Sequence, residues 1–193
     1  MSSKNAATNG EIKDHAWGAM ERGDYRAAFV NFHALLPTDD TAILNALGWM
    51  YERGEGCSKD LDQAALFYRQ SADVGSHYGL LGLGDVLTDC GKKDDAQAIY
   101  EKGALQGHAP SMWRLGKMLL EDERASDEKE RGLSLLRDAT DKGSLFARRT
   151  LLGYELRNAK SPIKKALIGI QILRLAISGI PRYVRDPLSS EVM

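Results

Sequence analysis

The chain has 193 residues, 43% of them apolar and 27% charged, a composition that supports a hydrophobic core and excludes both a disordered chain and an integral membrane protein. The formal net charge of −1 is unevenly distributed, because residues 1–143 hold 17 Lys/Arg against 24 Asp/Glu and residues 144–193 hold 9 against 3. The net charges of these two segments are therefore −7 and +6. The basic C-terminal segment could attract an acidic partner or an anionic membrane surface, although basic residues on a helix more often form a solvated surface.

The first ten residues, MSSKNAATNG, are polar and carry neither the apolar segment nor the cleavage site of a secretory signal. We therefore expect residues 1–10 to be disordered and the protein to be cytoplasmic.

From residue 11 onward the sequence predicts helices and no strand. The predicted helices cover residues 11–22, 24–36, 41–53, 60–74, 77–90, 93–106, 109–121, 127–142, 145–158 and 162–179. Pro181 and Pro187 predict that no helix continues through residues 181–193, which we expect to form a flexible tail.

The third and fourth predicted helices are separated by a turn that contains Gly54 and Gly56. A turn between antiparallel helices often needs a residue with positive φ just after the first helix, and glycine adopts that conformation at little cost. Either Ser58 or Asp60 is expected to cap the helix that follows.

Glycines also mark a repeat along the chain. Gly75, Gly107, Gly143 and Gly179 each close a predicted helix and are separated by 32, 36 and 36 residues. A Leu-Gly step recurs at residues 47–48, 83–84, 115–116 and 152–153. Small residues at fixed points let two helices approach closely, so each unit is predicted to be a pair of helices that buries its apolar surface against its neighbours.

The first complete unit resembles the Sel-one-like repeat, a relative of the tetratricopeptide repeat, at Leu47-Gly48, Tyr51, Gly54, Gly56, Asp60, Ala64, Phe67-Tyr68, Ala72 and Gly75. Fewer of these positions match in later units, and residues 11–37 resemble a tetratricopeptide hairpin instead. The resemblance implies an all-α fold, a right-handed α-solenoid of helix-turn-helix repeats, with about five hairpins in a single array over residues 11–180. It also implies a non-catalytic scaffold.

In such arrays the first helices of successive units line a concave groove. The groove positions implied by the resemblance are Lys13, Trp17, Asn45, Trp49, Arg53, Tyr78, Asp85, Trp113, Lys117, Tyr154 and Arg157. All three tryptophans of the chain are in this set, and aromatic and Arg side chains often dominate binding energy at interfaces. The alternative for each tryptophan is packing against a neighbouring helix.

The last predicted helix carries two apolar stripes, one at Ile163, Leu167, Ile170 and Ile177 and the other at Ile168, Ile172 and Leu175. One stripe is expected to pack on the array. The other needs a cover, for which the tail, a second copy of the protein and a membrane surface are the alternatives. A predicted helix this short, with charges in its interior, does not indicate a membrane span.

Catalytic motifs are absent from the sequence. Metal ligation is not predicted for the histidines, which lack HxxxH or HExxH spacing and lie at His15, His33, His77 and His108. Cys57 and Cys90 form no CxxC pair, and no GxSxG turn is present. We expect no enzyme activity, no metal, no cofactor and no nucleic-acid binding, the last because most of the chain is acidic.

Two functions follow as hypotheses. The leading one is an adaptor or scaffold that binds a protein or peptide segment in a concave, aromatic-lined groove. The alternative is a peripheral membrane-associated assembly factor, for example for envelope polysaccharide machinery, that contacts a membrane surface through residues 162–193. Self-association as a homodimer through the same region is a further alternative.

Overall fold

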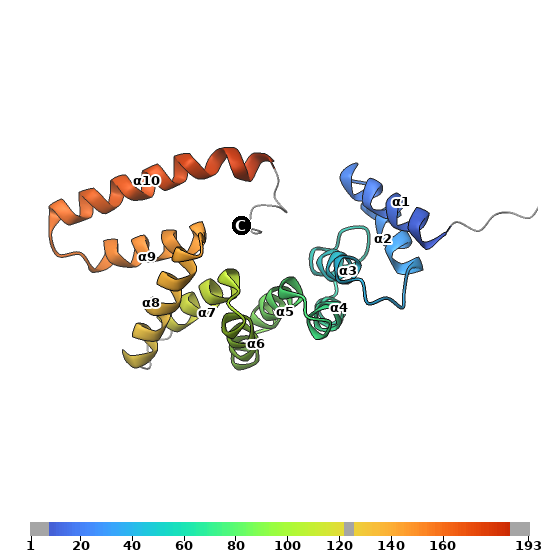
Figure 1. Cartoon of the computed structure of the whole chain (residues 1–193), viewed down its shortest axis with the longest axis horizontal. Helices are drawn as coiled ribbons and strands as arrows, with labels where there is room; N and C mark the ends of the chain where they lie inside the picture. The colour runs from blue at the N-terminus through green and yellow to red at the C-terminus, as the bar shows by residue number, and fades with distance from the viewer. Residues whose placement is uncertain (1–7, 122–125, 186–193) are drawn as a thin grey trace, which may run out of the picture. The chain divides into compact units, whose positions relative to one another are not determined.

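The computed structural model describes residues 8–121 and 126–185, and within these ranges the protein is all-α, with ten helices packed in sequence as pairs (Figure 1). The chain divides into two compact units, Met1–Ile99 and Tyr100–Met193. The predicted all-α class is therefore confirmed.

The first unit contains α1 (Asn9–Glu21), α2 (Tyr25–Ala34), α3 (Thr41–Arg53), α4 (Leu61–Asp73), α5 (His77–Asp89) and the start of α6 (Lys93–Leu105). The second unit contains the rest of α6, α7 (Ala109–Glu121), α8 (Ser126–Asp141), α9 (Leu145–Asn158) and α10 (Pro162–Arg185).

Many of the helices start where a short polar side chain accepts hydrogen bonds from free backbone N–H groups of the first turn. These caps are Thr8 for α1, Asp24 for α2, Asp40 for α3, Asp60 for α4, Ser76 for α5 and Ser144 for α9. Of the two predicted caps for α4, Asp60 is the one observed. Helix α1 begins two residues earlier than predicted, because Thr8 and Glu11 form a capping box.

The turn between α3 and α4 has the predicted left-handed glycines. Gly54 has φ 75° and its N–H donates to the Met50 carbonyl at 2.8 Å, which ends α3. Gly56 has φ 74°, and a Cβ at this position would overlap the Tyr25 carbonyl. This turn therefore requires glycine for two reasons, backbone conformation and close approach of the first hairpin.

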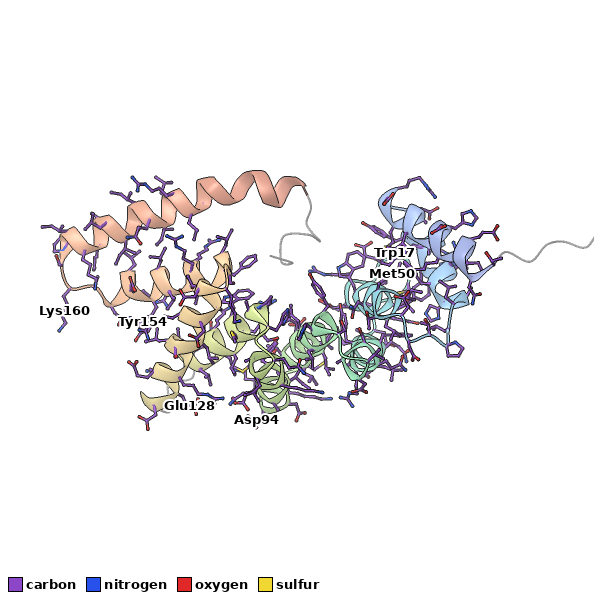
Figure 2. All side chains as sticks on the ribbon, in the orientation of Figure 1. Trp17, Met50, Asp94, Glu128, Tyr154 and Lys160 are labelled. Atoms are coloured by element: carbon purple, nitrogen blue, oxygen red, sulfur yellow. The ribbon has the colours of Figure 1, made fainter. Side chains whose placement is uncertain are left out.

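The core of the first unit is formed by apolar side chains of α1 to α4. Phe32, Leu44, Leu47 and Met50 are fully buried, and Trp17 packs against this cluster (Figure 2). These residues occupy the inward faces of successive helices, so the hairpins share one core.

An aromatic cluster also joins α2, α3 and α4. The Tyr51 ring stacks on Phe67 at a centroid distance of 5.7 Å and meets Phe29 edge-on at 5.3 Å. His33 Nε2 lies 3.1 Å from the Tyr51 hydroxyl, and burial lowers the pKa of His33. The imidazole of His33 thus forms part of the packing between the first two hairpins.

Tyr68 shows why the repeat needs small residues. Its buried ring lies between α3 and α5, where a Cβ on Gly48 would come within 2.8 Å of the ring and one on Gly82 within 2.6 Å. The Tyr68 hydroxyl donates to Glu52 at 2.9 Å. Burial raises the pKa of the Glu52 carboxyl, although this hydrogen bond opposes the effect. The close approach of helices predicted at Gly48, the glycine of the first Leu-Gly step, is confirmed.

The second unit repeats this device with a pair of glycines. A Cβ on Gly116 of α7 would lie 2.8 Å from the Gly132 carbonyl of α8, and a Cβ on Gly132 would lie 2.9 Å from the Gly116 carbonyl. Leu115 and Leu136 are buried on these two helices. The two backbones therefore approach each other directly.

The predicted end of the last helix at residue 179 is wrong, since α10 continues through Pro181 to Arg185. A proline removes one backbone hydrogen bond but holds φ near the helical value, so it does not by itself prevent the next turn. Disorder was predicted for residues 1–10, of which Thr8 caps α1 and Asn9 and Gly10 belong to its first turn. Residues 1–7 and the part of the predicted tail beyond Arg185 lie outside the described residues.

Candidate protein-binding site

A concave site in the described part of the second unit lies between α7 and α9. Helices α7 and α9 contact each other here, and α8, which lies between them in the chain, packs against both. Ser144 fixes the start of α9 by accepting from the Ala147 N–H at 3.2 Å, which places the first turn of α9 beside α7.

Trp113 is held in one orientation at the centre of this site. Its indole stacks on Phe146 at a centroid distance of 4.9 Å with 25° between the ring planes. The indole Nε1–H donates to Thr150 Oγ1 at 3.0 Å, and the Thr150 hydroxyl in turn donates to the Phe146 carbonyl at 2.9 Å. The guanidinium of Arg114, the next residue on α7, lies 4.4 Å from the centroid of the Trp113 ring. The half-buried indole is therefore a rigid aromatic surface.

Beside Trp113 there is a pocket of about 370 Å³. Its walls are formed by Trp113, Lys117, Leu120, Glu121, Phe146, Arg149, Thr150, Gly153 and Arg157. A volume of this size holds one or two amino-acid side chains of a partner rather than a whole folded element.

The charge of the pocket is positive. Lys117, Arg149 and Arg157 contribute three cations and Glu121 one carboxylate, and the Lys117 Nζ lies 3.8 Å from that carboxylate. All four charged side chains are exposed at the rim. The site therefore combines an aromatic wall with a basic rim.

In the first unit, the predicted groove residues at its N-terminal end already have partners in the protein. Lys13 Nζ donates to Asp40 Oδ2 at 2.6 Å, and this hydrogen bond holds the pKa of the Asp40 carboxyl below its usual range. The Trp17 ring meets Phe32 edge-on at 4.9 Å. Both residues therefore contribute to packing within the first unit.

Asn45 and Trp49, on α3, also have partners nearby. Asn45 Nδ2 donates at 3.1 Å to the Ser76 hydroxyl that caps α5, which links the second helix pair to the third. Trp49 lies 5.7 Å from the Tyr25 ring and is partly buried. Asn45 thus supports a helix start as well as lying at a predicted groove position.

The remaining predicted residues of the first unit are Arg53 on α3 and Tyr78 and Asp85 on α5, and two of them, Arg53 and Asp85, act on Glu52. Arg53 Nε lies 3.9 Å from the Glu52 carboxylate, and the charge of half-buried Asp85 contributes to the raised pKa of Glu52. Tyr78, on α5, has 41% of its surface exposed. These predicted residues therefore combine one cation, one carboxylate and one exposed phenol ring rather than charges of a single sign.

Of the four groove residues predicted in the second unit, three line the pocket: Trp113, Lys117 and Arg157. Tyr154, labelled in Figure 2, is not among the lining residues. Consecutive helical side chains are about 100° apart, so Tyr154 points away from the face that Gly153 marks.

Phe146, Arg149 and Thr150 line the pocket but are not among the predicted groove residues. With Gly153 and Arg157 they share one face of α9, at the spacing of i, i+3, i+4, i+7 and i+11. Extending each predicted groove position along its own helix face would have found them.

Among residues 8–121 and 126–185, no group of three His, Cys, Asp or Glu side chains is arranged to hold a metal ion. Within the same ranges, none of the helices has the length and apolar content needed to cross a bilayer.

No family model and no curated protein matches this sequence. Solved structures do match. One is a protective antigen present in uropathogenic Escherichia coli strains that displays a Sel1-like repeat (SLR) fold, with a TM-score of 0.72 and 18% identity over 89% of this chain. Another is a Sel1 repeat protein from Oxalobacter formigenes, with a TM-score of 0.65 and 17% identity over 82% of this chain.

The chain spans 38% of the length of the first of these proteins and 69% of the second. At such low identity the likeness concerns the fold alone. The protein has the Sel1-like repeat fold, which confirms the fold that the residues around Gly54 implied.

Proposed function

We propose that this protein is a non-catalytic adaptor that binds a segment of a protein partner, and that the pocket beside Trp113 is the centre of its binding surface. The observation that carries the proposal is the rigid indole of Trp113 at the wall of a basic-rimmed pocket. Rigid aromatic side chains give large contact areas at low entropic cost, and they are frequent anchors of interfaces.

The chemistry of the pocket selects the kind of segment. The aromatic wall of Trp113 and Phe146 favours an apolar side chain, and the basic rim favours a carboxylate close to it in sequence. The ligand we propose is an extended or helical segment with an acidic residue near an apolar or aromatic one.

The complete eleven-residue groove, in a single array over residues 11–180, remains part of the proposal. In the first unit Lys13 and Asn45 already donate hydrogen bonds to Asp40 and Ser76, so we place the centre of the binding surface in the second unit. We propose that the protein acts in the cytoplasm, on a partner that is either soluble or bound to a membrane.

The proposal is tested by selecting peptides from a random display library on the immobilised full chain, and then measuring their affinities for variants. Arg157→Glu reverses a charge at the pocket, and Arg148→Glu reverses one on an exposed side of the same helix that does not line the pocket. We expect acidic peptides with an apolar residue to be enriched. Arg157→Glu should lower the affinity of these peptides at least about tenfold, since a like charge replaces an opposite one.

Arg148→Glu is the matched control and should change the affinity little, because it alters the net charge by the same amount away from the pocket. If both variants lowered the peptide affinity equally, the effect would come from the overall charge of the protein and not from the pocket. Enriched peptides that lack acidic residues would contradict the proposed ligand.

A further inference from the structure

Helix α10 carries an uncovered apolar stripe. Ile163, Leu167, Ile170 and Leu173 are 74%, 56%, 49% and 61% exposed, respectively. Their spacing of four, three and three residues places them on one side of the helix over a length of roughly 15 Å. Contiguous exposed aliphatic side chains of this kind mark an interaction surface.

The opposite side of α10 is already used. Ile168, with 4% exposure, is buried with Leu152 and Ala159, and Ile172 and Leu175 pack against the same cluster. Figure 1 shows α9 along one side of α10. The exposed stripe is therefore a second apolar face, additional to the one that holds the helix in the unit.

The charges beside the stripe are all of one sign. Between Glu155 and Asp186 the sequence has no acidic residue, and the described side chains Lys160, Lys164, Lys165 and Arg174 are all exposed. Figure 2 shows Lys160 at the turn before α10, pointing outward from the helices. The partner of this face is expected to be anionic.

This charge pattern argues against a second copy of the chain as the cover. A symmetric pairing of two such helices brings the same basic side chains into one interface, where like charges repel each other. An aromatic anchor of the kind that dominates protein interfaces is also absent from the described side chains of α10. An aliphatic stripe between cationic side chains is instead the pattern of a helix that lies in the plane of a membrane surface.

We propose that α10 lies on an anionic lipid surface, with the stripe of Ile163, Leu167, Ile170 and Leu173 between the headgroups. In this arrangement Lys160, Lys164 and Arg174 contact lipid phosphates. Arg174 follows Ile170 by four residues, so it lies at the C-terminal end of the stripe, and its long side chain can extend to the headgroups. This inference does not rest on the pocket beside Trp113, which belongs to α7 and α9.

The test measures co-sedimentation of the full chain with vesicles of phosphatidylcholine alone and with vesicles that contain about one third phosphatidylserine. The stripe variant carries Leu167→Gln and Leu173→Gln. The control variant carries Val30→Gln and Leu105→Gln, which remove two aliphatic side chains that are 59% and 89% exposed elsewhere. Circular dichroism establishes that both variants are folded.

We expect the wild type to bind the anionic vesicles and not the neutral ones, with binding that weakens as salt is added. The stripe variant should lose at least roughly tenfold in partition coefficient, and the control variant should keep the wild-type value. Absence of wild-type binding to anionic vesicles, or equal binding of the two variants, would overturn the proposal. Light scattering that shows a wild-type dimer and a monomeric stripe variant would overturn it in favour of a second copy.

Discussion

Asp40 combines two interactions at the start of α3. One carboxylate oxygen accepts from the backbone N–H groups of Ala42 and Ile43, at 2.9 and 3.4 Å, and the other accepts from Lys13. The first interaction caps the helix, and the second connects α1 to α3. Substitutions at this one residue separate the two.

Asp40→Ala should lower the free energy of unfolding by about 1 to 2 kcal/mol at neutral pH, because it removes the cap and the ion pair together. Asp40→Asn keeps a capping oxygen and should cost less than about 1 kcal/mol. Urea denaturation followed by circular dichroism measures both values. An Asn variant as unstable as the Ala variant would show that the charge, not the cap, is the important interaction.

The pH dependence of this pair has a definite sign. The pKa of Asp40 is lowered in the folded protein, so its stabilising effect is present above the unfolded pKa of about 4 and is lost as the pH falls through the folded value. The difference between wild type and Asp40→Asn should therefore disappear at acidic pH. Lys13→Met is the matched control, because it removes the ion pair and keeps the Asp40 cap. At neutral pH it should lower the free energy of unfolding by the same amount as Asp40→Asn.

At the scale of single residues, the sequence predicted conformations better than contacts. The positive φ of Gly54 and Gly56 follows from a local rule about helix ends, and it is confirmed. The contacts of Trp17 and Trp113 depend on which neighbouring helix supplies the ring beside them, Phe32 in one case and Phe146 in the other. Position in the repeat does not contain that information.

At the scale of helices, Tyr68 and the two glycines beside it determine how closely α4 approaches α3 and α5. A methyl group on Gly48 would lie 2.8 Å from the buried Tyr68 ring, whose hydroxyl is bonded to Glu52. The ring therefore has little freedom to move away. The spacing between these helices depends on the absence of a side chain.

Gly48→Ala should destabilise the protein by about 1 to 3 kcal/mol, even though alanine favours a helix over glycine by up to about 1 kcal/mol. Gly169→Ala is the control, since a Cβ at Gly169 on α10 meets no atom within 4 Å. The control should be neutral or stabilising by up to about 1 kcal/mol. Chemical denaturation of the two variants gives both numbers, and a stabilising Gly48→Ala would refute the close-packing argument.

Most helices could be located from the sequence because caps and closing glycines are local signals. The bounds of α3, α7 and α9 agree with those predicted. The length of α10 could not be predicted in this way, because a proline near a helix end allows either a stop or one lost hydrogen bond. Which of these occurs depends on packing beyond the proline.

At the scale of the whole molecule, stability should be local. The helix pairs that pack in both units are neighbours along the chain or next but one, such as α3 with α5 and α7 with α9. In a repeat array of this kind, stability is approximately a sum of the repeats and their nearest interfaces. Damage to one hairpin is therefore expected to stay near it.

Native-state hydrogen exchange on the full chain can follow this effect in a Gly116→Val variant. The new side chain would meet the Gly132 carbonyl and Leu136 at less than 3 Å from its Cβ, and such overpacking costs about 1 to 3 kcal/mol. Amides of α7 and α8 should therefore exchange roughly 5- to 100-fold faster, since each 1.4 kcal/mol corresponds to a factor of ten. Amides of α1 to α3 should keep their wild-type rates, because Gly116 and the atoms that its new side chain would meet all belong to the second unit. A uniform acceleration in both units would mean that the ten helices unfold as one cooperative body, and the description of the protein as a sum of neighbouring helix pairs would then fail.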